Sequence, residues 1–240
     1  MYNDFMNRII KDNLEKLLDL IYPPSIYCGI CGNLIDETRS YSLCDHCVRH
    51  ILWDTGGICE EQGLKLLRCA EYGLYARSLI FSLKYSGKRY ISRSIAEMMR
   101  DKLAAAGVYA DVIVPVPLYS EKENARGFNQ TELIGRHLAE FTGMDFAPGT
   151  LKRVRATRPM RGLSPTEREQ NVYGSFSFVP AYEPMIRGRR VVIIDDFFAT
   201  GATARECRRV LKEARPAEVL FLSFAAKFRH DELGGLPEVK

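Results

Sequence analysis

A run of four β-branched residues, Val191–Ile194, leads directly into the adjacent aspartates Asp195 and Asp196. Uninterrupted apolar strands of this kind are typical of parallel sheets whose two faces are both covered by helices. Two phenylalanines and the small-residue loop 199–203 follow, and the next segment has helical spacing. The stretch therefore predicts a strand–loop–helix unit of an α/β sheet. The loop would lie at the carboxyl end of a strand, where such sheets bind ligands.

The rest of the chain supports an α/β fold in which a mostly parallel sheet is flanked by helices. Helical spacing is seen at 74–85, 90–107, 129–143 and 202–215, and strands are predicted at the start of 111–118 and at 173–179, 191–194 and 218–225. From residue 111 to 225 strands alternate with helices, an order that implies right-handed crossovers between parallel strands. Residues 150–172 show no clear period, and we expect them to be mostly loop.

A change near residue 70, from a cysteine-rich segment to one with regular apolar spacing, predicts two domains. Residues 1–70 would hold an amphipathic N-terminal helix, ended by Pro23 and Pro24, and a cysteine-rich module; residues 71–240 would hold the α/β domain. No apolar run approaches the ~20 residues of a membrane span, and charges interrupt the N-terminal segment, so we expect a cytoplasmic protein without a signal peptide. The net charge of +4 is weak support for nucleic-acid binding.

Four cysteines predict a metal site. Two C-x-x-C pairs are separated by twelve residues, and their members are Cys28, Cys31, Cys44 and Cys47. Tetrahedral Zn²⁺ takes four thiolates at about 2.3 Å, so the pattern predicts one structural zinc ion. Cys59 has Gln62 where a further C-x-x-C would place its second cysteine, so we predict no second zinc.

The loop after the two aspartates has the features of a phosphate site. The free N–H groups and the dipole at a helix N-terminus favour an anion, a glycine lets the backbone approach it, and threonine hydroxyls add donors. The phosphate would lie on Ala199, Thr200, Gly201, Ala202 and Thr203. Asp195 and Asp196 would accept hydrogen bonds from ribose hydroxyls. The layout predicts a ribose 5-phosphate ligand, with a solvated strand end and an ordinary N-cap as the alternative.

With these motifs the chain resembles the ComF (competence protein F) family of type I phosphoribosyltransferase-like proteins. The matching segments, in order, are CGICG, LCDHC, LKYSGKR, PVPL, RGFNQ, TRPMRGLSPTEREQNVYGSF and DDFFATGAT. The resemblance implies a type I phosphoribosyltransferase-like fold behind an N-terminal zinc ribbon. It also implies phosphoribosyl diphosphate (PRPP) as ligand, with Mg²⁺ bound largely through it, and a link to DNA uptake or utilisation.

The family architecture implies where the pyrophosphate of PRPP would lie. In type I enzymes it is held by a loop after the first core strand, and the matching candidates here are Pro117, Leu118, Tyr119, Arg126, Lys84 and Arg161. For the prolines the alternative is an ordinary strand end, and for Lys84 and Arg126 a surface position. Residues 152–168 correspond to the mobile loop that closes over the site and excludes water.

Two positions depart from the family pattern, and the function stays open. Ala199 replaces a threonine, which removes a hydroxyl but no backbone N–H and predicts weaker, retained phosphate binding. Met160 replaces a glutamine, and no residue stands out as a general base. One interpretation is an active phosphoribosyltransferase, a pentosyl glycosyltransferase with an unknown nitrogenous acceptor. The others are a non-catalytic PRPP-binding protein, and an adaptor for single-stranded DNA or a competence helicase in natural transformation. The oligomeric state is open, a dimer included.

Overall fold

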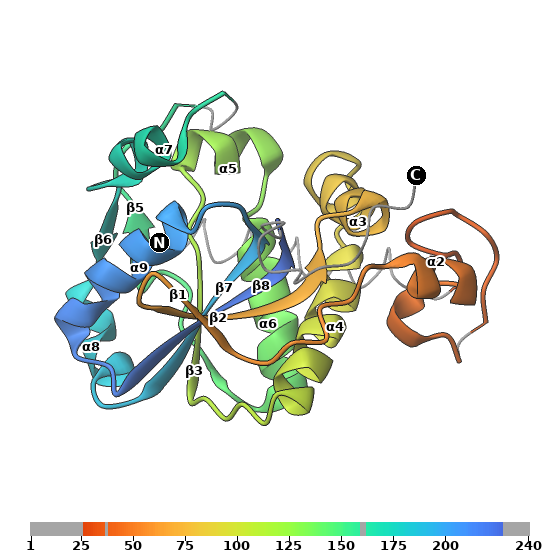
Figure 1. Ribbon diagram of the computed structural model, residues 1–240, viewed down its shortest axis with the longest axis horizontal. Coiled ribbons are helices and arrows are strands. Elements are labelled where there is room, and N and C mark those ends of the chain that lie inside the picture. Colours follow the sequence, from red (N-terminus) through yellow and green to blue (C-terminus); the bar gives the residue numbers. More distant parts are fainter. Residues whose placement is uncertain (1–25, 37, 159–161, 228–240) are drawn as a thin grey trace, which may run out of the picture. The chain divides into compact units, whose positions relative to one another are not determined.

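The computed structural model describes residues 26–36, 38–158 and 162–227 (Figure 1). The chain divides into two compact units, Met1–His50 and Ile51–Lys240. The predicted amphipathic helix lies outside the described residues. Among the helices of the described part, none is both long and apolar enough to cross a membrane.

The first unit is rich in turns. It contains the 3₁₀ helix η1 (Ser40–Ser42) and the short helix α2 (Asp45–His50). A tight turn follows Cys28, whose N–H donates to the carbonyl of Asn33 at 2.8 Å, while the N–H of Gly32 donates back to the Cys28 carbonyl at 2.9 Å. Gly32 has φ of 75°, which a glycine adopts without strain. The cysteines, not an apolar core, are the notable feature of this unit.

The second unit is built on a six-stranded sheet in the order β1-β2-β8-β7-β3-β4. Its strands are β1 (Cys59–Glu61), β2 (Leu64–Glu71), β3 (Val112–Pro115), β4 (Asp145–Phe146), β7 (Arg190–Phe198) and β8 (Glu218–Ala226). All neighbouring pairs are parallel except β1 with β2. A separate antiparallel pair consists of β5 (Leu151–Arg153) and β6 (Phe176–Phe178). The predicted parallel sheet is confirmed.

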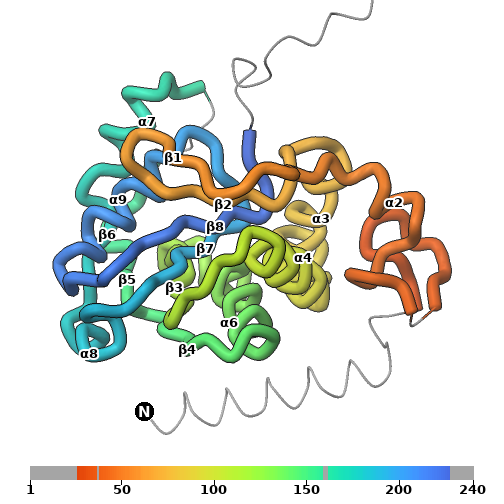
Figure 2. Tube along the Cα trace, turned by 60° about the horizontal axis from the view of Figure 1, so that its bottom comes forward, coloured from red at the N-terminus to blue at the C-terminus, as the bar shows by residue number. Residues whose placement is uncertain are grey.

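Helices cover both faces of this sheet, as Figure 2 shows: α4 and α6 lie on one side, and α9 with β5 and β6 on the other. The longer helices are α3 (Leu74–Tyr85), α4 (Ile91–Ala105), α6 (Gln130–Thr142) and α9 (Ala202–Leu211). Shorter ones are α5 (Ser120–Arg126), α7 (Pro165–Val172), α8 (Glu183–Ile186), η2 (Pro180–Tyr182) and η3 (Lys212–Ala214). Because Val191–Ile194 is covered on both sides, all four of its side chains are buried.

The four helices expected from apolar spacing are all present, with ends close to the predicted ones. At the start of α6 the Asn129 side chain accepts from the N–H of Thr131 at 3.2 Å, and at its end Gly143 is left-handed with φ of 73°. Asparagine at the N-cap and a left-handed glycine at the end are typical of helices. The N-cap also matters for the site, because it sets the position of Gln130.

Residues 150–158 and 162–172 contain more regular structure than the prediction of mostly loop. They contain β5 and the helix α7, which begins with a capping box: the Ser164 hydroxyl accepts from the N–H of Glu167, and the Glu167 carboxylate accepts from the N–H of Ser164. The S-P-T-E pattern with proline at the first helical position was the sequence signal for this helix. The apolar period failed to reveal it because α7 is mostly exposed.

Residues 59–71 also differ from the sequence interpretation, which left them in the cysteine-rich module. They form β1 and β2, and Leu66 and Leu67 of β2 pair with β8 inside the main sheet. Both leucine side chains are fully buried. The two compact units of the structure divide between His50 and Ile51, so β1 and β2 belong to the second unit.

Candidate functional site

Strand β7 carries the two aspartates into the carboxyl edge of the sheet, between β8 and β3. Successive side chains of a strand point to opposite faces. Asp196 accordingly contacts α3 and α6 on one face, through Lys84 and Gln130. Asp195 interacts electrostatically with Cys207 of α9 on the other face. The two adjacent carboxylates thus lie on opposite faces of the sheet.

Asp196 is the buried member of the pair. Its side chain is only 4% exposed, and the ammonium group of Lys84 forms an ion pair with its Oδ2. The amide Nε2 of Gln130 donates to Oδ1 at 3.5 Å, and Arg126 donates to the Gln130 side chain in turn. Burial is the largest influence and opposes ionisation of Asp196, but the Lys84 charge and the side-chain hydrogen bonds that Asp196 accepts together outweigh burial and lower the pKa of this carboxyl. The same pairing raises the pKa of Lys84 in spite of burial.

Asp195 is in the opposite electrostatic situation. Burial, together with the neighbouring negative charge of Asp196, raises the pKa of Asp195 well above its usual range. One of its oxygens accepts from the N–H of Asp196 at 2.8 Å. Its charge is therefore poorly compensated in the protein alone. A ligand that brings hydroxyl donors or a cation would supply what is missing.

The loop between β7 and α9 has the backbone of an anion site. Gly201 is the N-cap residue and has φ of 77°, a conformation that a side chain would strain. A Cβ at this position would also lie 2.5 Å from the guanidinium of Arg205 and 2.9 Å from the ring of Phe198. The first helical hydrogen bond runs from the N–H of Arg205 to the Gly201 carbonyl at 2.8 Å. The amides of residues 202–204 therefore have no intrahelical acceptor.

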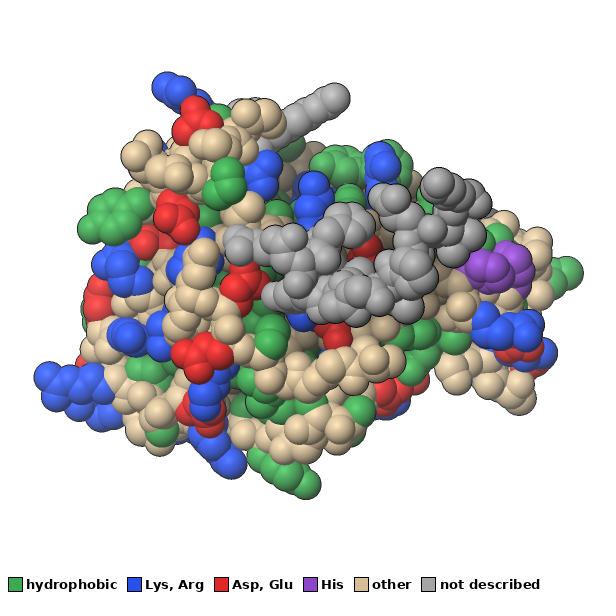
Figure 3. Space-filling view, viewed as in Figure 1, with side chains coloured by type: hydrophobic (Ala, Val, Ile, Leu, Met, Phe, Trp, Pro, Cys, Tyr) green, Lys and Arg blue, Asp and Glu red, His purple; other side chains and the backbone are tan. Residues whose placement is uncertain are grey.

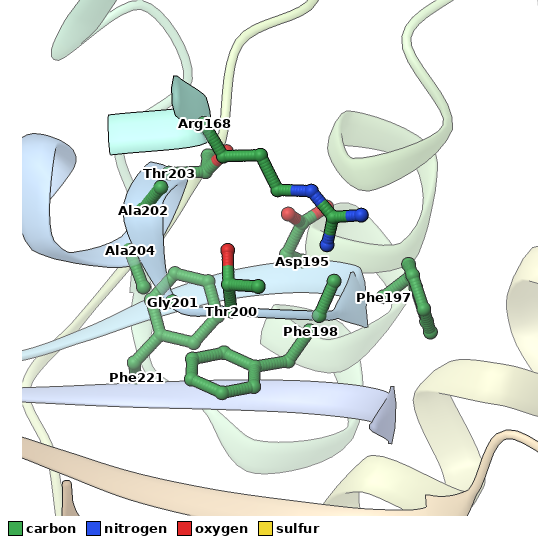
Figure 4. A pocket seen from close by; sticks show the side chains of 11 residues that line it. Arg168, Asp195, Phe197, Phe198, Thr200, Gly201, Ala202, Thr203, Ala204 and Phe221 are labelled. Carbon is green, nitrogen blue, oxygen red and sulfur yellow. The ribbon is translucent and has the colours of Figure 1, made fainter. Parts of the chain in front are cut away.

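A cavity of about 170 Å³ lies on this loop (Figure 4). It is lined by the loop residues Ala199, Thr200, Gly201, Ala202 and Thr203, with Ala204, by Asp195 and three phenylalanines of β7 and β8, and by Arg168 of α7. Figure 4 shows the Arg168 guanidinium reaching over Thr200 toward Asp195. Its Nε is buried and has no hydrogen-bond partner among the described residues. The structure thus brings the predicted phosphate loop, Asp195 and an arginine cation to one cavity.

Arg205 stabilises the loop between β7 and α9 by hydrogen bonds, a role that the sequence interpretation missed. Its guanidinium donates to the carbonyl of Thr200 at 2.8 Å and to the carboxylate of Glu169 at 2.5 Å. Glu206, the next residue of α9, accepts from the N–H of Gly174 at 2.7 Å. These contacts tie α7, and with it Arg168, to the helix that starts at the loop. An arginine four residues after the N-cap glycine was the available signal, but its partner could not be read from the sequence.

The predicted pyrophosphate residues lie along the carboxyl edge next to Asp196. Lys84, Leu118 and Arg126 line one cavity of about 760 Å³ together with Gln130. Pro117 and Leu118 line a neighbouring cavity of about 290 Å³. Tyr119 is the N-cap residue of α5, and Arg161 and Met160 lie outside the described residues. The structure therefore groups three of the candidates, and Pro117 lines the cavity beside them.

The four cysteines of the first unit fit a zinc ion. Their Sγ atoms all lie within 4.8 Å of one another, and those of Cys31 and Cys44 are 3.7 Å apart. Tetrahedral Zn–S bonds of about 2.3 Å place two sulfurs roughly 3.8 Å apart, so the spacing matches. Although burial disfavours its thiolate, backbone N–H groups directed at its sulfur lower the pKa of Cys28 to about 7. In the described part of the chain, this is the one cluster of such ligands.

Comparison with known proteins finds one domain match in each half of the chain. A double zinc ribbon domain matches residues 17–79, and a phosphoribosyl transferase domain matches residues 142–232. Competence protein F of Haemophilus influenzae is 28% identical over 201 residues, which cover 80% of this chain and 87% of that protein. DNA utilization protein YhgH of Salmonella typhimurium is 28% identical over 194 residues, covering 77% and 83%.

Among solved structures, glutamine PRPP amidotransferase from B. subtilis is 26% identical, with a TM-score of 0.38, and covers 55% of this chain and 25% of that one. The two relatives match along most of their length, and the two domain models match separate parts of this chain. The chain is therefore similar over most of its length to competence protein F and to YhgH, and it joins a match to a double zinc ribbon domain with a match to a phosphoribosyl transferase domain.

Proposed function

We propose that the α/β unit binds PRPP together with Mg²⁺. The observation that carries this proposal is the cavity at the β7–α9 loop. Free helix amides, the hydroxyls of Thr200 and Thr203, the cation of Arg168 and the carboxylate of Asp195 all meet there. A phosphate binds to the amides, the threonine hydroxyls and the arginine cation, and the hydroxyls of an attached sugar donate to the Asp195 carboxylate.

Each part of PRPP has a candidate partner. The 5-phosphate lies on residues 199–203 with Arg168 above it, and the ribose hydroxyls donate to Asp195. Asp196 acts from the opposite face, where its ion pair with Lys84 holds that ammonium at the edge of the larger cavity. Lys84 and Arg126 then attract the pyrophosphate, Arg126 as a planar donor fork. This arrangement gives the two adjacent aspartates different roles toward one ligand.

Mg²⁺ would be bound mainly by oxygen atoms of the ligand, as is usual for this ion with phosphates. The protein fits such an arrangement at Asp195, because the raised pKa of this carboxyl reflects negative charge without a sufficient counter-charge. When bound, Mg²⁺ neutralises the pyrophosphate. The protein residues position the ribose and exclude water from its C1.

Pentosyl transfer to a nitrogen acceptor is the reaction that this ligand supports. The acceptor nitrogen bonds to C1 of the ribose as the C1–oxygen bond breaks, pyrophosphate leaves with the bonding electrons, and the nitrogen releases its proton to solvent. The protein contributes positioning and charge stabilisation. We propose that the bound ligand serves the uptake or utilisation of DNA, for which the relatives are named.

The test is calorimetric titration of the zinc-loaded full chain with PRPP, with and without Mg²⁺. We expect saturable, Mg²⁺-dependent binding that ribose 5-phosphate displaces and Asp195→Asn removes. Asp145→Asn is the matched control, since that carboxylate is 57% exposed and lies at the start of β4, near the other edge of the sheet. No saturable binding to folded wild-type protein would refute the proposal. Pyrophosphate release with candidate bases or amines then separates an enzyme from a PRPP sensor.

A further inference from the structure

The cavity of about 290 Å³ next to the pyrophosphate candidates has a charged lining that the proposed function does not use. We call it the α5–β5 cavity, because α5 and β5 contribute to its walls together with the end of β3 and the start of α6. Its charged residues are Glu123 and Glu132 from the helices and Lys152 and Arg153 from β5. Ligand pockets have volumes of about 300–1,000 Å³, so a cavity of this size suits a small molecule rather than a polymer.

The two glutamates of this cavity are poorly compensated. Burial, together with the negative charge of Glu132, raises the pKa of Glu123. Glu132 has a weak ion pair with Arg136 at 3.8 Å, whereas Glu123 has no ion-pair partner among the described residues. The Glu123 carboxylate is thus a half-buried negative charge that a second carboxylate repels. An ammonium group of a ligand would supply the missing positive charge.

The guanidinium of Arg153 is held in place by the protein but is not fully hydrogen-bonded. It lies over the ring of Phe176, 5.2 Å from the ring centroid, and donates to the hydroxyl of Thr157 at 2.6 Å. Its Nε is buried and has no hydrogen-bond partner in the described part of the chain. No ion pair between these residues joins Arg153 to either glutamate of the cavity. A carboxylate is the group that a guanidinium fork of this kind binds best.

The α5–β5 cavity lies beside the groups that would react. Leu118 lines this cavity and also the cavity of about 760 Å³ that we propose for the pyrophosphate. Burial lowers the pKa of Arg153, and the nearby Cys207 and Asp195 act in the opposite direction. Arg153 is therefore close enough to the proposed ribose partner Asp195 for their charges to interact. A molecule in this cavity would be a neighbour of both the ribose and the leaving group.

Charged groups of both signs also occur on the surface near this cavity. Figure 3 shows basic and acidic side chains around α5 and α7, in the upper part of the view. Surface charge there favours neither a simple anion nor a simple cation. Selection of a ligand therefore depends on the lining of the cavity, which offers carboxylates and a guanidinium that do not neutralise each other.

We propose that the α5–β5 cavity binds an amino acid as the acceptor of the phosphoribosyl group, with its ammonium on Glu123 and its carboxylate on Arg153. The inference rests on the proposed function and adds the chemical class of the acceptor. Glu123 accepts a proton from the ammonium, and the freed nitrogen lone pair bonds to C1 of the ribose. The C1–oxygen bond breaks, and pyrophosphate leaves with the bonding electrons. The resulting secondary ammonium releases one proton to solvent, so Glu123 is the general base of the reaction.

The experiment measures pyrophosphate release by the zinc-loaded full chain with PRPP and Mg²⁺. The common L-amino acids are added together and then one at a time, and each active one is compared with the amine that lacks only its carboxylate. We expect an amino acid to accelerate release above the rate with PRPP alone. It should reach half of its maximal rate at a concentration about tenfold lower than the amine requires, because a charged hydrogen bond is lost with the carboxylate.

Substitution of Arg153 tests the carboxylate contact. Arg153→Met should raise the half-saturating concentration of the amino acid about tenfold and leave that of the amine unchanged. The amine is thus an internal control for folding, since a misfolded variant would lose both substrates. Arg153→Lys keeps the positive charge and should restore part of the preference for the amino acid.

Substitution of Glu123 tests the proton transfer. Glu123→Gln should lower the rate at saturating amino acid about a hundredfold or more, the usual contribution of a general base. Its PRPP binding in calorimetry should equal that of wild type. Glu121→Gln is the matched control, because Glu121 lies in the first turn of the same helix and is exposed. This control should release pyrophosphate at the wild-type rate.

Three results would overturn the proposal. One is protein that binds PRPP but releases pyrophosphate no faster with any L-amino acid. Another is acceleration by a nucleobase and by none of the amino acids, and the third is an amine that serves as well as its amino acid. Glu123→Gln with wild-type activity would remove Glu123 as the base. Lack of PRPP binding to the folded chain refutes the proposed function itself, and calorimetry detects that failure before any acceptor is added.

Discussion

Replacing Asp196 with asparagine tests the electrostatic arrangement at the end of β7. In the wild-type protein Asp196 is 4% exposed and Lys84 20% exposed, and the two form an ion pair. Asparagine keeps the shape and one acceptor oxygen but leaves the lysine charge without its partner. Breaking a buried pair in this way costs about 3–5 kcal/mol. Because Lys84 retains some solvent contact, we expect a loss near the lower value, about 3 kcal/mol.

Thermal unfolding followed by circular dichroism measures this loss. For a unit of this size each kcal/mol lowers the melting temperature by about 2–4 °C, so Asp196→Asn should lower it by about 6–12 °C. The double variant with Lys84→Met removes both charges and should recover part of the loss. Asp195→Asn should instead raise the melting temperature at neutral pH, since it removes a carboxylate whose ionisation is disfavoured.

The pH dependence supplies a second check. The pKa of Asp196 is lowered in the folded protein, so its contribution is present above the unfolded pKa of about 3.9 and is lost as pH falls through the folded value. The difference between wild type and Asp196→Asn should therefore shrink in solution more acidic than about pH 4. A variant as stable as wild type at neutral pH, or a difference that grows in acid, would refute the reasoning.

Four further changes address the phosphate loop and the metal. Arg168→Ala should weaken PRPP binding about tenfold or more in calorimetry, because a charged hydrogen bond contributes about 1.5–3 kcal/mol, with little change in melting temperature. Ala199→Thr should tighten the same binding a few-fold by restoring a hydroxyl donor. Gly201→Ala should cost about 1–3 kcal/mol in denaturant unfolding, since φ is 77° and the Cβ meets a guanidinium. Cys44→Ser should reduce zinc in metal analysis from about one ion per chain to nearly none; retention of the ion would refute the four-cysteine site.

Local patterns were sufficient to predict the elements that build the phosphate loop. The apolar run 191–194 and the helical period of 202–215 are patterns between residues that are close together in the sequence. These patterns do not depend on a distant partner, and the structure has a strand and a helix at these places. The parallel order follows as well, because crossover helices leave few other topologies.

The pairings that complete the site could not be predicted, because they join residues far apart in the chain. Nothing near Lys84 indicates that its partner is Asp196, and nothing near Arg205 indicates Glu169. Strand β2 escaped notice for a related reason: its cysteine-rich surroundings indicated a metal module, whereas its leucines pair with the last strand of the chain. Such contacts depend on the assembled sheet, and a single sequence carries no signal of them.

The two aspartates show what the fold adds to a motif. Read as a sequence, adjacent carboxylates indicate one sugar site with two acceptors. In a strand they must point to opposite faces, and here one faces the cavity at the phosphate loop while the other holds Lys84 at the edge of the larger cavity of about 760 Å³. A change of Asp195 to asparagine should therefore weaken binding of the sugar and phosphate while removing a carboxylate whose ionisation is disfavoured, which stabilises the fold at neutral pH. The same change at Asp196 should destabilise the fold and release Lys84 at the larger cavity. Comparison of the two variants separates these effects.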